Sequence, residues 1–95
     1  MSDAPNGLLV ELETLFGEAG KAHHEAFIDT GGEDLEWPAW YAEKLIGSLS
    51  GLLKAKFTTS ELIYLLVWAE KERSLRAPGA KWARYYARFF IERYG

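Results

Sequence analysis

The sequence contains no cysteine, which excludes disulfide bonds, zinc sites with thiolate ligands and catalytic cysteine nucleophiles. Its longest hydrophobic run, Leu62 to Ala69, is eight residues long, whereas a membrane-spanning helix needs about 20. The segment from Met1 to Asn6 has neither the basic start nor the apolar run of a secretion signal. We therefore expect a soluble, cytoplasmic protein with no membrane contact.

Motifs of established enzyme chemistry are also missing. There is no nucleophile elbow, Walker loop or dinucleotide-binding fingerprint. The zinc-protease and di-iron patterns fail around His23-His24-Glu25, since Gly20 and Lys21 stand three residues before the histidines. The acidic segment 29–36 lacks the donor spacing of a calcium-binding EF-hand loop. The sequence predicts no catalytic residue, no cofactor and no metal ligand, so an enzymatic role is the weaker hypothesis.

What the chain does contain is typical of a small globular domain. It has 95 residues, of which 48% are hydrophobic and 15% aromatic, including four tryptophans. A disordered chain does not carry so many large apolar side chains, and a chain of this length forms one hydrophobic core. We expect a single domain.

The hydrophobic residues recur every three or four positions, and no stretch alternates as a strand does. Paired glycines at 31–32 and the Ala77-Pro78-Gly79 segment break the pattern. The periodicity predicts helices at about 7–28, 38–55, 59–75 and 80–94, after a flexible N-terminus at residues 1–6. The expected fold class is all-α, a four-helix bundle.

The third predicted helix carries the clearest local signals. Thr58 and Glu61 have the spacing of a capping box, and Phe57 and Leu62 have that of a hydrophobic staple. The run from Leu62 to Ala69 contains no polar residue. A helix without a polar face is covered nearly all round, so we expect cover from the chain's own bundle or from another subunit.

The net charge of −3 conceals two halves of opposite sign. Residues 1–47 contain ten acidic and two basic residues, a net charge of −8, and residues 48–95 contain nine basic and four acidic residues, a net charge of +5. Lys81, Arg84 and Arg88 lie beside aromatic residues, a combination that suits nucleic acid. Because the whole domain is acidic, we favour pairing of the two halves, within one fold or between subunits, over nucleic-acid binding or capture of an anion.

The two histidines have different expected roles. His23 lies on the apolar stripe of the first helix and is predicted to be a hydrogen-bonded core residue. His24 lies on the glycine-containing flank near the acidic loop, and His24 and Asp34 are the candidate ligand-binding residues. They support the alternative function, a small-molecule- or metal-binding domain with catalysis as an option.

Self-association has the strongest support in the sequence. The aromatic residues and the apolar third helix exceed what a core of this size readily covers, and exposed apolar patches mark interfaces. The leading hypothesis is a non-enzymatic helical protein that forms a homo-oligomer, as an assembly subunit or as an accessory module that binds a partner protein. The proposed interface residues are Trp37, Trp40, Tyr41, Tyr64, Trp68 and Trp82.

Four segments are distinctive: Ala22–Phe27, the Trp-Pro-x-Trp-Tyr-Ala motif at Trp37–Ala42, the acidic glycine loop Asp29–Asp34, and Tyr85–Phe90. They resemble a family of small bacterial helical proteins without an established activity. The resemblance implies a stand-alone helical domain and supplies no catalytic residues. Any pocket shared by the first two segments would be lined by His24, Asp34, Trp37, Trp40 and Tyr41.

Overall fold

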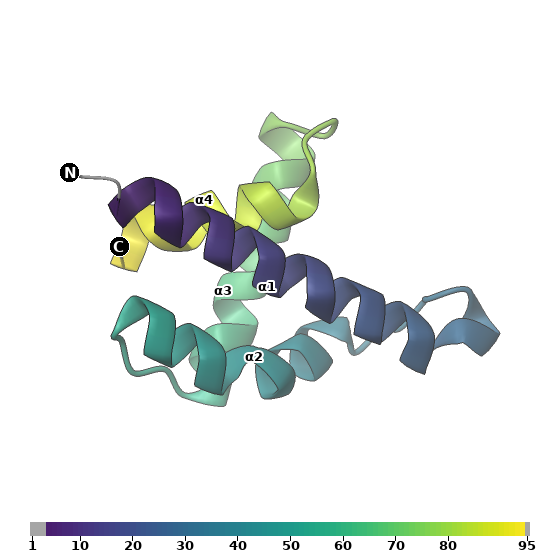
Figure 1. Ribbon diagram of the computed structural model, residues 1–95. Coiled ribbons are helices and arrows are strands. Elements are labelled where there is room, and N and C mark those ends of the chain that lie inside the picture. Colours follow the sequence, from purple (N-terminus) through teal and green to yellow (C-terminus); the bar gives the residue numbers. More distant parts are fainter. Residues whose placement is uncertain (1–3, 95) are drawn as a thin grey trace.

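The helices of this protein follow one another with short connections (Figure 1). The computed structural model describes residues 4–94, with side chains for residues 7–94. Within that range the elements are α1 (Ala4–Ala26), a short 3-10 helix η1 (Ile28–Thr30), α2 (Trp37–Leu53), α3 (Thr59–Arg76) and α4 (Trp82–Tyr94), without any strand. The prediction of an all-α, four-helix single domain is confirmed.

The helix ends differ slightly from those expected. Helix α1 begins at Ala4, so residues 4–6 of the expected flexible N-terminus are helical, while residues 1–3 lie outside the described range. The first helix ends at Ala26 because the chain tightens into η1, whose cap Gly31 has a left-handed φ of 68°. Pro38 stands in the first turn of α2, where its missing N–H leaves no hydrogen bond unmade.

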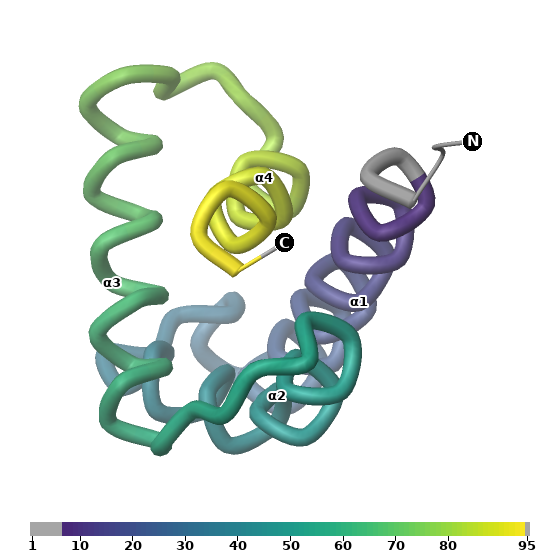
Figure 2. The backbone as a smooth tube through the Cα atoms, turned by 90° about the vertical axis from the view of Figure 1, so that its left-hand side faces the viewer, coloured from purple at the N-terminus to yellow at the C-terminus, as the bar shows by residue number. Residues whose placement is uncertain are grey.

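The helices pack chiefly in two pairs, α1 against α4 and α2 against α3. Figure 2 shows α3 at one side of the molecule, with α4 and α2 on its inner side and no other element on its outer side. Helices α1 and α2 pack against each other, as do α3 and α4, which closes the arrangement around one core.

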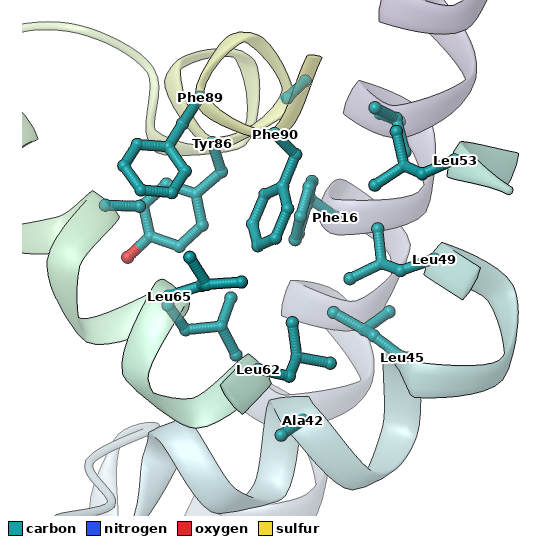
Figure 3. Packing of buried hydrophobic residues seen from close by; sticks show 14 of the residues in the cluster. Phe16, Ala42, Leu45, Leu49, Leu53, Leu62, Leu65, Tyr86, Phe89 and Phe90 are labelled. Atoms are coloured by element: carbon teal, nitrogen blue, oxygen red, sulfur yellow. The ribbon is translucent and has the colours of Figure 1, made fainter. Parts of the chain in front are cut away.

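The core lies where all four helices meet. Phe16 of α1 and Phe90 of α4 are fully buried, with ring centroids 5.8 Å apart. Figure 3 shows leucines of α2 and α3 pointing toward this pair. The largest fully buried side chains are Phe16, Phe90, Leu12, Leu45, Leu49, Leu62 and Leu66.

The start of α3 has the capping box predicted from the sequence. The Thr58 N–H donates to Glu61 Oε1 at 2.8 Å, and the Glu61 N–H donates to Thr58 Oγ1 at 3.0 Å. Phe57, just before the cap, packs edge-on against Phe90 and Tyr94 of α4. Local hydrogen bonds and two aromatic contacts therefore fix where α3 begins.

The bundle does not cover α3 all round. Only the inner side is buried, and its fully covered residues are Leu62, Leu65, Leu66 and Ala69. On the outer side Tyr64 is 65% exposed, and at its edge Trp68 is 39% exposed while packing edge-on against Phe89 of α4. The chain's own helices therefore cannot supply the expected cover, because α2 and α4 both pack on the same side of α3.

The acidic and basic halves are joined by a single ion pair within the described part of the chain. Arg84 Nη1 of α4 lies 3.1 Å from Glu13 Oε1 of α1. The other Arg–carboxylate pairs, Arg73–Glu70 and Arg93–Glu72, form inside the basic half. Pairing of the halves within one fold is therefore slight.

Candidate functional site

A cleft of about 600 Å³ opens between α1, the loop after η1, the start of α2, and the facing parts of α3 and α4. Its apolar lining consists of Phe16, Leu35, Trp37, Tyr41, Leu66, Trp82 and Tyr86. Its polar lining consists of His23, Gly32, Glu33, Asp34, Glu70 and Arg73. Concave, mostly apolar sites with a few polar groups are where proteins bind small molecules.

Four aromatic rings form one wall of this cleft. Trp37 packs edge-on against Tyr41 at 6.1 Å between centroids, Tyr41 against Trp82 at 5.9 Å, and Trp82 against Tyr86 at 5.2 Å. Trp82 fits beside α1 because residue 20 is glycine: a Cβ there would lie 2.7 Å from Trp82 Cζ2. Gly20 thus allows Trp82 of α4 to approach α1 closely.

A hydrogen bond between His23 and Asp34 joins α1 to the loop between η1 and α2, where both residues line the cleft. His23 Nε2 lies 3.1 Å from Asp34 Oδ2, and both side chains are less than a tenth exposed. Asp34 Oδ1 also accepts a hydrogen bond from the Glu36 N–H at 2.9 Å. The prediction of a hydrogen-bonded core histidine at position 23 is confirmed.

The imidazole of His23 is surrounded by aromatic rings. Tyr41 stacks on it at 5.0 Å, Phe27 lies at 4.7 Å, and Trp40 meets it edge-on at 4.9 Å. The loop that carries Asp34 turns back toward α1 through Gly32, whose φ is 90° and whose N–H donates to the Phe27 carbonyl at 2.8 Å. These contacts bring the first two family-like segments together.

A second polar network, from α3 and α4, also lines the cleft. Arg73 donates from Nε and Nη2 to the two carboxylate oxygens of Glu70, at 3.0 and 2.7 Å. The Tyr86 hydroxyl donates to Glu70 Oε1 at 2.9 Å, and Figure 3 shows it pointing toward α3. The hydrogen bond from Arg73 lowers the pKa of Glu70, and burial, followed by the hydrogen bond to Glu70, raises the pKa of Tyr86.

The raised pKa of Tyr86 predicts a loss of stability in alkali. Its neutral form is favoured in the folded state, so this contribution is complete below the unfolded pKa of about 10 and is lost as pH rises beyond it. At pH 8 we expect the free energy of unfolding of Tyr86→Phe to be about 1 kcal/mol lower than that of the wild type. Above pH 10 the free energy of unfolding of Tyr86→Phe should fall less steeply with pH than that of the wild type. The two slopes should differ by about 1.4 kcal/mol per pH unit.

Urea denaturation at pH 8, 10 and 11 measures both effects. Tyr94→Phe removes a hydroxyl from a partly exposed residue at the end of α4 and serves as the matched control. If Tyr86→Phe and the wild type lost stability at the same rate above pH 10, Tyr86 would not be the buried, neutral donor described here.

The structure places the proposed site residues in three locations. Asp34, Trp37, Tyr41 and Trp82 line the cleft. Trp40 lies behind it, against His23 and Phe27. Tyr64 and Trp68 lie together on the outer side of α3.

His24 was expected to line the pocket, but it lies outside the cleft. His23 lines the cleft instead. Adjacent residues on a helix point about 100° apart, so His24 is exposed when its neighbour faces inward. The His24 ring rests against Gly32, where a Cβ would lie 2.8 Å from Nδ1. Sequence reasoning also missed Glu70, Arg73 and Tyr86, although the Glu-x-x-Arg spacing signals an ion pair on one helix face.

The outer side of α3 carries two neighbouring exposed aromatic rings. The centroids of Tyr64 and Trp68 are 5.8 Å apart. The Arg93 guanidinium stacks 4.4 Å from the Trp68 ring and 3.7 Å from the Phe89 ring, and its Nη2 lies 3.7 Å from Glu72 Oε2. Trp68 is therefore held in one orientation while remaining partly exposed.

Within residues 4–94, no group of three or more His, Cys, Asp or Glu side chains is arranged to hold a metal ion. The helices described there include none that is long and apolar enough to span a membrane. Comparison of the chain with protein-family models, curated proteins and solved structures gives no match to any of them, so the family resemblance stays a prediction.

Proposed function

We propose that this protein is a non-enzymatic binding module that self-associates through the outer side of α3. The observation that carries the proposal is the adjacent pair Tyr64 and Trp68. Tyr64 is 65% exposed, and Trp68 is 39% exposed although it packs against Phe89 and Arg93 of α4 at the edge of the outer side. Large aromatic residues supply most of the binding energy in protein interfaces. Arg93 holds Trp68 in place before any contact forms, which reduces the entropy lost on binding.

The charges along α3 favour a second copy in antiparallel orientation. A two-fold pairing that sets Tyr64 of one copy level with Trp68 of the other also sets Glu61 level with Lys71, since both pairs are centred on Leu66. Glu61 and Lys71 are both exposed. Opposite charges would therefore meet at both ends of the aromatic contact, as an isologous interface requires.

The test compares the association constant of the wild type with that of a double variant that carries Tyr64→Ser and Trp68→Ser. We expect this double variant to associate at least about 30-fold more weakly than the wild type, since each ring is a candidate hot spot. Sedimentation equilibrium over a range of concentrations measures the effect. Ile28→Ser removes a side chain of similar exposure, 63%, from a different surface and should leave association unchanged.

The charge reversal Lys71→Glu tests the orientation. It sets two carboxylates at the same level in the antiparallel pair, so we expect weaker association that recovers in part at high salt. Lys81→Glu makes the same charge change at an exposed position of the loop before α4 and is the control. A wild-type protein that stays monomeric at millimolar concentration would contradict the proposal, as would equal association of all these variants.

The second candidate function is small-molecule binding, the alternative raised by the sequence. The observation in its favour is the cleft, whose volume of about 600 Å³ lies in the usual range for ligand pockets. Asp34 lies in this cleft but His24 does not, so the candidate now depends on Asp34, His23 and the aromatic wall.

A further inference from the structure

We infer that the aromatic cleft binds a small organic cation, an alkylammonium group attached to an apolar carbon skeleton. The inference concerns a surface separate from the outer side of α3, and it does not depend on self-association. It follows from the rings that line the cleft, from the charges around them, and from the way the single arginine is used.

The rings supply the attraction for a positive charge. Trp37, Tyr41 and Trp82 all line the cleft, in a continuous series of edge-to-face contacts. The faces of aromatic rings carry negative potential, and tryptophan attracts cations most strongly. Aromatic cages of this composition are the usual means of recognising substituted ammonium groups.

The charged side chains reinforce the same sign. Three carboxylates, those of Glu33, Asp34 and Glu70, line the cleft with one guanidinium, that of Arg73. With His23 neutral the lining has a formal charge of −2, and with His23 protonated it is still −1. An anion would be repelled from this cleft, whereas a cation is favoured both by the carboxylates and by the rings.

Arg73 is not available to bind an anion in place of the ammonium group. Its Nε and Nη2 donate to the two oxygens of Glu70, and its Nη1 donates to the Pro78 carbonyl at 3.2 Å. Glu70 also accepts from the Tyr86 hydroxyl, and these bonds hold its carboxylate ionised and fixed in position. Ser74 Oγ donates to Glu70 Oε2 as well, so Glu70 and Arg73 neutralise each other, and the net negative charge of the lining comes from Glu33 and Asp34.

The four indole N–H signals in a ¹H–¹⁵N NMR spectrum provide the test. Trp37 and Trp82 line the cleft, whereas Trp68 lies on the outer side of α3. Choline is the probe, 3,3-dimethylbutan-1-ol is its uncharged analogue of the same shape, and acetate is the anion control. We expect choline to shift the Trp37 and Trp82 signals and to leave the Trp68 signal unmoved, with the uncharged analogue binding at least about tenfold more weakly.

Two variants locate the binding energy. Trp37→Leu should weaken choline binding about tenfold, and Glu33→Gln, at an exposed rim position, should weaken it severalfold. Trp68→Leu removes a tryptophan away from the cleft and should bind choline as the wild type does. Trp68→Leu affects the proposed assembly surface, and Trp37→Leu affects the cleft. Self-association and choline binding can therefore each be disproved independently of the other.

Three results would overturn the inference. The first is equal binding of choline and its uncharged analogue, which would mean that shape alone decides. The second is stronger binding of acetate than of choline. The third is the absence of any shift of the Trp37 and Trp82 signals at 10-millimolar choline, roughly the weakest affinity a cage of this kind would give.

Discussion

Replacing Phe16 with alanine should lower the free energy of unfolding by about 3–5 kcal/mol. Phe16 is fully buried and lies 5.7–6.2 Å, between ring centroids, from Tyr86, Phe90 and Trp82. Its removal leaves a cavity between α1 and α4 that the surrounding rings cannot fill without leaving their edge-to-face positions. A domain of this size has a total stability of about 5–15 kcal/mol, so the variant should be close to unfolding.

Urea denaturation at fixed protein concentration measures this loss, since self-association changes apparent stability with concentration. Leu35→Ala is the control, because Leu35 is 98% exposed and its truncation should change the free energy of unfolding by about 0.5 kcal/mol or less. A loss below about 1.5 kcal/mol for Phe16→Ala would mean that the helices do not meet around this ring.

His23→Ala and His24→Ala should differ sharply although the residues are adjacent. His23→Ala should cost about 2–4 kcal/mol, because it removes the hydrogen bond to Asp34 and empties a space bounded by Phe27, Trp40 and Tyr41. His24→Ala should cost about 0.5 kcal/mol or less, because its side chain is exposed.

Thermal and urea unfolding of the two variants at neutral pH gives the comparison directly. The indole N–H signal of Trp40, which packs edge-on against the imidazole of His23, should move in His23→Ala and stay in place in His24→Ala. Equal losses of stability in the two variants would contradict the placement of His23 inside and His24 outside.

Features set by neighbouring residues were predictable from the sequence. The capping box at Thr58 and Glu61 needs only two residues three positions apart, and it is present. The burial of His23 followed from its place on the apolar stripe of the first helix. Periodicity and capping act within a few turns of one helix, so they are readable without knowledge of its neighbours.

Features that join distant helices were not predictable in this way. The sequence did not show that Trp82 packs against Tyr41, enters the space above Gly20 and lines the cleft. The hydrogen bond from Tyr86 to Glu70 spans two helices. These contacts depend on how α1, α3 and α4 cross, and a single sequence does not specify crossing angles.

The apolar run of α3 is a further feature whose packing partner could not be predicted from the sequence. Its composition indicated cover on all sides, but composition does not say which element supplies that cover. The structure places α2 and α4 on one side of α3. It leaves Tyr64 exposed on the other side and Trp68 partly exposed at the edge, against Phe89 of α4. The open side is therefore the place where a second copy is proposed to bind.

Native mass spectrometry of the untagged wild-type protein tests that claim most directly. We expect a discrete even multiple of the 10.8 kDa chain mass, which returns to 10.8 kDa when Tyr64 and Trp68 are both replaced by serine. A wild-type protein found only at 10.8 kDa across the accessible concentrations would contradict it.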